Sequence, residues 1–147
     1  MRFAMLCLAL GLAACAFNGR PAAPQGVFFP RLTGAPPHYG AAAVEGTLVE
    51  DHGCLELTNL SLSAEFASPS PGAVVLPLWP GGSEATRTDG GGLRVDAPGL
   101  PAVETGKRVF LGGAFTPSAA DAEQKVGEPI PAECRVGLYW VATPNQT

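Results

Sequence analysis

Residues 44–58 read VEGTLVEDHGCLELT, two short apolar runs on either side of a polar turn. In CLELT, leucine alternates with polar residues, which is the two-residue period of a strand buried on one face. The four residues EDHG between the runs have the length of a hairpin loop, and we expect Gly53 to adopt a positive φ. The stretch therefore predicts a β-hairpin with strands at Val44–Val49 and Cys54–Thr58.

Four further apolar runs, separated by glycine- and proline-rich segments, predict additional short strands: Ala73–Trp79, Leu93–Val95, Arg108–Leu111 and Arg135–Ala142. Pro77 lacks an N–H for a sheet ladder, so we expect its strand at an edge or a bulge. Gly112 and Gly113 are expected to end the run that precedes them. The last run is the longest and is predicted to close the domain.

One helix is predicted at Ala119–Val126, with Ser118 as its N-cap and Gly127 as its end. The predicted fold class is all-β: a small OB-like barrel, or a sandwich, of five to six short strands with one short helix. The OB fold usually has its helix between the third and fourth strands, whereas the helix predicted in this chain precedes the last strand.

The composition sets the scale of the fold and excludes one class of partner. The chain has 147 residues, including 19 glycines and 15 prolines, which fits one loop-rich domain. Its formal net charge of -4 leaves no basic stripe for phosphates. We therefore expect no nucleic-acid partner.

The N-terminus has the pattern of an export signal. Arg2 precedes Phe3–Leu12, an apolar run too short to cross a bilayer, because ten helical residues rise only about 15 Å. The run ends in Leu12-Ala13-Ala14-Cys15, which resembles the lipobox of bacterial lipoproteins. The resemblance implies a diacylglycerol thioether on Cys15, cleavage before it, and acylation (as by palmitate) of the new amino terminus. The alternative is an ordinary cleaved signal followed by an incidental cysteine.

This resemblance divides the chain into a signal peptide (1–14), a lipidated N-terminus with a proline-rich tether (15–40) and a β domain (41–147). The expected location is the cell envelope, anchored to a membrane by lipid. Ala16 stands where lipoproteins kept at the inner membrane commonly have Asp, which favours the outer membrane if the organism has one. Val27–Phe29 is apolar, so we expect it to pack on the domain.

The four cysteines are expected to have three fates. Cys7 leaves with the signal, Cys15 is lipidated, and Cys54 and Cys134 remain to form a disulfide in an oxidising compartment. That bond would close a loop of about 80 residues, worth roughly 4–5 kcal/mol. Two free buried thiols or a metal pair are the alternatives.

The strand period raises a question about this disulfide. Cys54 has the parity of Glu56 and would point outward, whereas Cys134 has the parity of Val136, Leu138 and Trp140, which are expected to be buried. We therefore expect both cysteines at strand ends.

No catalytic pattern is evident around the two histidines, His38 and His52. Glu50-Asp51-His52 offers three metal-binding side chains, but adjacent residues of a turn rarely converge on one ion. We expect no metal, no cofactor and no enzymatic activity. The alternatives are an envelope hydrolase that uses His52 or His38, and a carrier of a small ligand or metal.

The aromatic residues suggest a binding contact. Trp79 and Trp140 fit a core, whereas Tyr139 has the opposite parity and is predicted to be an exposed ligand contact. Residues 41–142 are loosely similar to small bacterial envelope lipoproteins of no known activity, through Gly53-Cys54-Leu55, Trp79-Pro80, Gly112-Gly113, and Pro131 and Cys134 leading to Tyr139-Trp140. The expected function is a non-catalytic binding or structural module, with an envelope protein or glycan as its partner.

Overall fold

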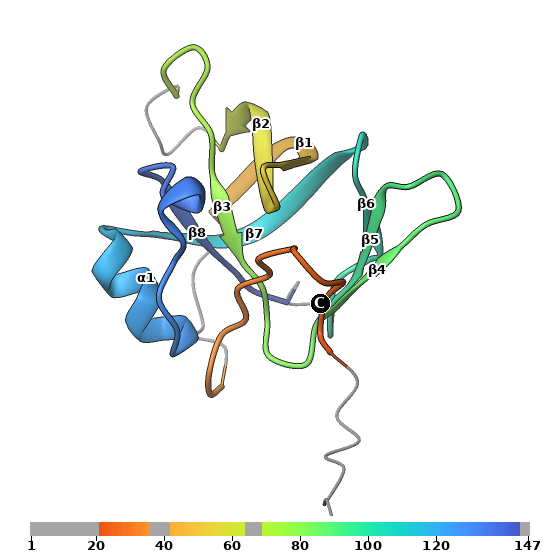
Figure 1. Ribbon diagram of the computed structural model, residues 1–147. Coiled ribbons are helices and arrows are strands. Elements are labelled where there is room, and N and C mark those ends of the chain that lie inside the picture. The colour runs from red at the N-terminus through yellow and green to blue at the C-terminus, as the bar shows by residue number, and fades with distance from the viewer. Residues whose placement is uncertain (1–20, 36–41, 64–68, 145–147) are drawn as a thin grey trace, which may run out of the picture.

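The computed structural model describes residues 21–35, 42–63 and 69–144, which form two β-sheets and one α-helix (Figure 1). The larger sheet has the strand order β2-β1-β7-β8-β3 and the smaller sheet β4-β5-β6. The elements are β1 Ala43–Asp51, β2 Cys54–Leu62, β3 Leu76–Leu78, β4 Glu84–Arg87, β5 Leu93–Asp96, β6 Val103–Glu104, β7 Arg108–Thr116, α1 Ala119–Val126, the 3-10 turn η1 Ala132–Cys134, and β8 Tyr139–Ala142. The predicted class, all-β with one short helix, is confirmed. The described residues contain eight strands rather than five to six, because β4 and β6 had no clear apolar signal.

The hairpin predicted from residues 44–58 is formed by β1 and β2. Asp51 pairs with Cys54, and the two residues between them, His52 and Gly53, have φ of 49° and 78°. Two central residues with positive φ make the turn whose twist matches that of the flanking strands. The prediction for Gly53 is confirmed, and His52 adopts the same region.

The larger sheet curls until its two edge strands nearly meet. Leu57 of β2 and Val75, just before β3, exchange two backbone hydrogen bonds of 2.8 and 3.0 Å. This is one isolated bridge rather than a ladder. The described residues therefore form no closed barrel, and the closure implied by an OB-like barrel is not found.

An N-terminal segment, residues 22–33, lies across the remaining gap between these edges. The Phe28 N–H donates to the Gly53 carbonyl at 2.7 Å, and the Trp79 N–H donates to the Pro30 carbonyl at 2.9 Å. The Ala22 carbonyl accepts from β4, and the Thr33 N–H donates to the end of α1. The expected packing of Val27–Phe29 on the domain is confirmed, and the folded contacts extend from residue 22.

Two hydrophobic cores lie on opposite faces of the larger sheet. The first core lies between the sheets: Phe29, Val44, Leu48, Leu55, Leu57, Val75, Trp79, Ala85, Leu93, Val95, Val109, Leu111, Trp140 and Ala142. The second core lies under α1 and η1: Leu32, Cys54, Leu76, Leu78, Ala122, Val126, Ile130, Cys134, Tyr139 and Val141. Strands β2 and β8 contribute to both cores.

Strand β7 continues past the glycines that were expected to end it. Gly113 has φ of 147°, and a Cβ at this position would lie 1.9 Å from the Val141 carbonyl oxygen. The absence of a side chain lets β8 approach β7 closely. The predicted strand end was wrong because these glycines serve strand pairing.

The C-terminal region differs from the single strand expected at Arg135–Ala142. Residues 135–138 form an irregular connection that follows η1, and only β8 pairs, with β7 on one side and with β3 in parallel on the other. β3 is an edge strand of this sheet, as Pro77 predicted. Leu138, which was expected to be buried, is one of the exposed large hydrophobic residues.

The helix is confirmed at its predicted bounds. Ser118 caps it by accepting a hydrogen bond from the Asp121 N–H at 3.1 Å, and Gly127 ends it with φ of 74°. Among the described residues, no helix is long and apolar enough to cross a membrane.

Cys54 and Cys134 form the predicted disulfide, with their Cα atoms 5.5 Å apart. Cys54 is the first residue of β2, a strand end as expected, whereas the strand end expected at Cys134 was wrong, because Cys134 lies in η1 and the next strand begins only at Tyr139. The outward orientation that the strand period gave for Cys54 is wrong, because a second core covers this face of β2 and Cys54 is buried in it together with Cys134. Next to this disulfide, the Arg135 guanidinium donates to the Glu123 carboxylate of α1 at 2.6 Å, which ties the connection after η1 to the helix.

Candidate functional site

The hairpin turn does not gather its three polar side chains around one point. Glu50 is bound by Arg87 of β4 through two hydrogen bonds, and this ion pair lowers the pKa of the Glu50 carboxyl. His52 Nδ1 lies 2.8 Å from Asp51 Oδ1, and both side chains are exposed. The described part of the chain contains no group of three or more His, Cys, Asp or Glu side chains arranged to hold a metal ion.

Two of the residues singled out from the sequence, Cys15 and His38, lie outside the described residues. The predicted lipidation at Cys15 and any role of His38 therefore stay predictions.

Tyr139 is not the exposed contact that its parity suggested. It is 2% exposed and packs in the second core, while its neighbour Trp140 packs in the first core. The parity argument failed because β8 is covered on both faces. The Trp140 indole donates to the Gly112 carbonyl at 3.2 Å, so it too belongs to the framework.

One buried carboxyl has no evident structural partner. Glu56 is 6% exposed on the second-core face of β2, and no hydrogen bond to its carboxylate is found among the described residues. Burial raises the pKa of Glu56, and the nearby negative charge of Asp51 raises it further. The charged form of Glu56 is therefore a cost to the fold.

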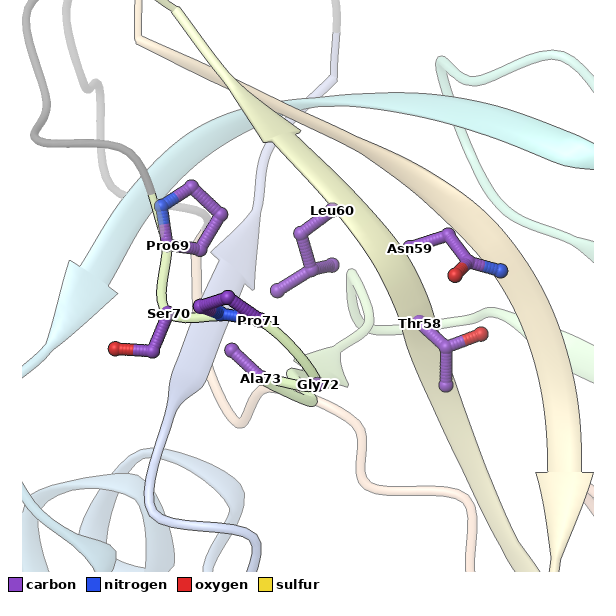
Figure 2. Close-up of a pocket in the computed structure, with 8 residues that line it drawn as sticks. All are labelled: Thr58, Asn59, Leu60, Pro69, Ser70, Pro71, Gly72 and Ala73. Carbon is purple, nitrogen blue, oxygen red and sulfur yellow. The ribbon is translucent and has the colours of Figure 1, made fainter.

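A pocket of about 350 Å³ lies between β2 and the loop that leads to β3 (Figure 2). Its lining contains no titratable side chain: Thr58, Asn59, Leu60, Pro69, Ser70, Pro71, Gly72 and Ala73. Figure 2 shows Leu60 lying toward the loop, with Thr58 and Asn59 farther from it. This set of groups suits contact with a neutral ligand and offers no acid or base for catalysis. The proline- and serine-rich composition of the loop was the only sequence signal for it.

A second pocket, of about 280 Å³, lies where the chain turns from the smaller sheet into the larger one. It is lined by Trp79 and by two facing segments, residues 100–103 and 108–111. Most of these side chains are apolar, and Phe110 is 60% exposed. Nothing in the local sequence indicated this pocket, because its two walls come from segments that the strand predictions treated separately.

No family model, curated protein or solved structure matches the chain. The fold and its pockets define a small all-β domain, built on two sheets and cross-linked by one disulfide.

Proposed function

We propose that the chain is the precursor of a bacterial lipoprotein whose mature form holds a non-catalytic binding domain at the cell envelope. The observation that carries the proposal is the Leu12-Ala13-Ala14-Cys15 sequence directly after the apolar run. Two or more acyl chains on one N-terminus give stable anchoring, which a single chain does not. The Cys54–Cys134 disulfide supports export, because such bonds persist in oxidising compartments.

The arrangement of the domain supports a binding role away from the membrane. The described chain begins at residue 21 at the bottom of Figure 1, whereas the loop with Pro69–Ala73 lies at the top. An anchor on the N-terminal side would leave this pocket facing away from the lipid. The binding partner we propose is an envelope protein or a glycan, and the favoured membrane is the outer one where the organism has one.

Mass spectrometry of the protein purified from membranes tests the anchor. We expect the N-terminal peptide to begin at Cys15 and to carry acyl mass. Cys15→Ser should abolish processing and acylation, while Cys7→Ser, a matched change within the signal, should leave both intact. An N-terminal peptide without acyl mass contradicts the proposal.

The non-catalytic role is tested by replacing both histidines. A His38→Ala/His52→Ala variant should retain the cellular phenotype of the wild-type protein, since neither residue would take part in chemistry. A loss of phenotype with normal protein levels would favour a hydrolase instead.

A further inference from the structure

The turn between β4 and β5 contains an exposed aspartate, Asp89, whose carboxyl is not held by any other group of the described chain. The three other aspartates of the described residues each have a side-chain partner: Asp51 with His52, Asp96 with Arg94, and Asp121 with Ser118. For the Asp89 carboxyl, neither a hydrogen bond nor an ion pair is found within the described residues. Its carboxyl is therefore free to react.

The residue after Asp89 is Gly90, and the two form the only Asp-Gly pair in the sequence. Two backbone hydrogen bonds of 2.9 Å close the turn, from the Thr88 N–H to the Gly92 carbonyl and from the Gly91 N–H to the Thr88 carbonyl. Neither bond uses the Gly90 N–H, for which no acceptor is found among the described residues. Figure 1 shows the turn projecting from the smaller sheet, and Asp89 and Gly90 are both exposed to water.

A carboxyl and the N–H of a following glycine are the reactants of cyclic imide formation. The Gly90 nitrogen bonds to Asp89 Cγ as a Cγ–O bond of the carboxylic acid breaks, and the proton of the N–H leaves with the hydroxyl as water. Glycine favours this step because it has no Cβ to restrict the backbone rotation that brings the two atoms together. The product is a succinimide, which water reopens.

We propose that Asp89 is a modification site at which the protein converts its own aspartate to isoaspartate. Attack of water on Cγ breaks the new bond and restores aspartate. Attack on the main-chain carbonyl carbon of Asp89 breaks the original peptide bond, so the chain then runs through the side chain. The two steps release and consume one water, and nothing is oxidised or reduced, so the isoaspartyl protein has the mass of the original.

The modification would change the contact that links the two sheets at this end of the domain. The Arg87 side chain donates to the Gly91 carbonyl at 3.2 Å and binds Glu50 of β1. Isoaspartate adds a methylene group to the main chain of the turn, which moves the Gly91 carbonyl relative to Arg87. The inference goes beyond the proposed binding function, because it requires neither the lipid anchor nor a partner.

Ageing of the purified wild-type protein, with its disulfide intact, tests the site. Fresh and aged samples are digested, and their peptides are separated and fragmented by a method that distinguishes isoaspartate from aspartate. We expect aged protein to contain an isomeric Asp89 peptide of unchanged mass. The Asp96 and Asp121 peptides of the same sample serve as internal controls and should contain aspartate alone, because Arg94 and Ser118 hold their carboxyls. An aged Asp89 peptide without isoaspartate overturns the proposal.

Three variants separate this chemistry from general degradation. Asp89→Glu keeps the charge but would have to close a larger ring, so the isomer should be lost. Gly90→Ala should reduce its yield severalfold, and it preserves the fold because the new Cβ would come no closer than 4.0 Å to another group. Asp96→Glu is the matched control and should leave the yield at Asp89 unchanged.

Wild-type yield of the isomer in Gly90→Ala, or an isomeric peptide that persists in Asp89→Glu, overturns the proposal. These readouts do not depend on acylation of Cys15. A failed lipid anchor and a failed modification site are therefore distinguishable.

Discussion

The two cores of this domain are built in different ways. The first core is closed by strands of two sheets, and on β5 and the first half of β7 buried residues alternate with exposed ones. The second core lies between the outer face of the larger sheet and a short helix, a 3-10 turn and a disulfide. Strand β8 is buried at all four positions, because one face serves each core.

This difference shows what the alternation of a strand sequence does and does not report. Alternating polarity identifies a strand with one solvated face, and it was informative for the first core. Where a second layer of structure covers the other face of a strand, as in β8, the alternation of a sequence does not indicate which side chains are exposed. The following predictions ask how strongly each core depends on its own contacts.

The largest expected effect is the loss of the disulfide, which ties η1 to β2 across the second core. Cys134→Ala should lower the free energy of unfolding by about 4–5 kcal/mol, because the unfolded chain regains the freedom of a long loop. Urea denaturation measures the loss, and the reduced wild-type protein should match the variant. An unchanged urea midpoint would show that the second core holds without its cross-link.

The next effect concerns the close contact between β7 and β8. Gly113→Ala would place a Cβ 1.9 Å from the Val141 carbonyl oxygen, at a φ that favours glycine. We expect it to cost about 2–3 kcal/mol in stability. Gly90→Ala is the control, since its new Cβ would come no closer than 4.0 Å to another group. Thermal unfolding that places both variants together would contradict the role given to Gly113.

A smaller effect of opposite sign is expected at Glu56. The pKa of this carboxyl is raised in the folded protein, so the ionised form destabilises the fold above that pKa. The penalty disappears as the pH falls below the unfolded value, so stability should rise as the pH drops. Glu56→Gln should therefore be more stable than wild type at about pH 7, and the difference should close toward about pH 4. Denaturation curves across this range measure it, with exposed Glu128→Gln as the control; a destabilised Glu56→Gln variant would contradict the prediction.

The smallest effect is expected at the ion pair between the two sheets. Arg87 of β4 binds Glu50 of β1 at the surface, where such pairs contribute little. Arg87→Ala should lower the urea midpoint least in this series, and high salt should reduce the difference further. Arg94→Ala is the matched control, because its partners Asp96 and Glu104 both lie in the smaller sheet. A loss as large as that of Cys134→Ala would make the surface pair, rather than the first core, the main link between the sheets.

Local signals predicted the elements whose structure depends on local chemistry. The hairpin turn at Gly53, the helix between Ser118 and Gly127 and the edge position of Pro77 are all confirmed. The candidate site was less predictable. Tyr139 was expected to be exposed and is buried, and the pocket beside Phe110 went unnoticed. A burial pattern depends on what packs against each face, which neighbouring residues in sequence do not determine.

The sequence by itself determined the all-β class, the positions of the hairpin and helix, and the pairing of Cys54 with Cys134. These follow from backbone preferences and from the chemistry of a few residues. Only the tertiary structure decided that the larger sheet has a core on each face, that the N-terminal segment spans the gap between β2 and β3, and that residues 100–103 and 108–111 face each other across a pocket. These features arise from contacts between segments distant in the chain, where packing and strand pairing override the local pattern.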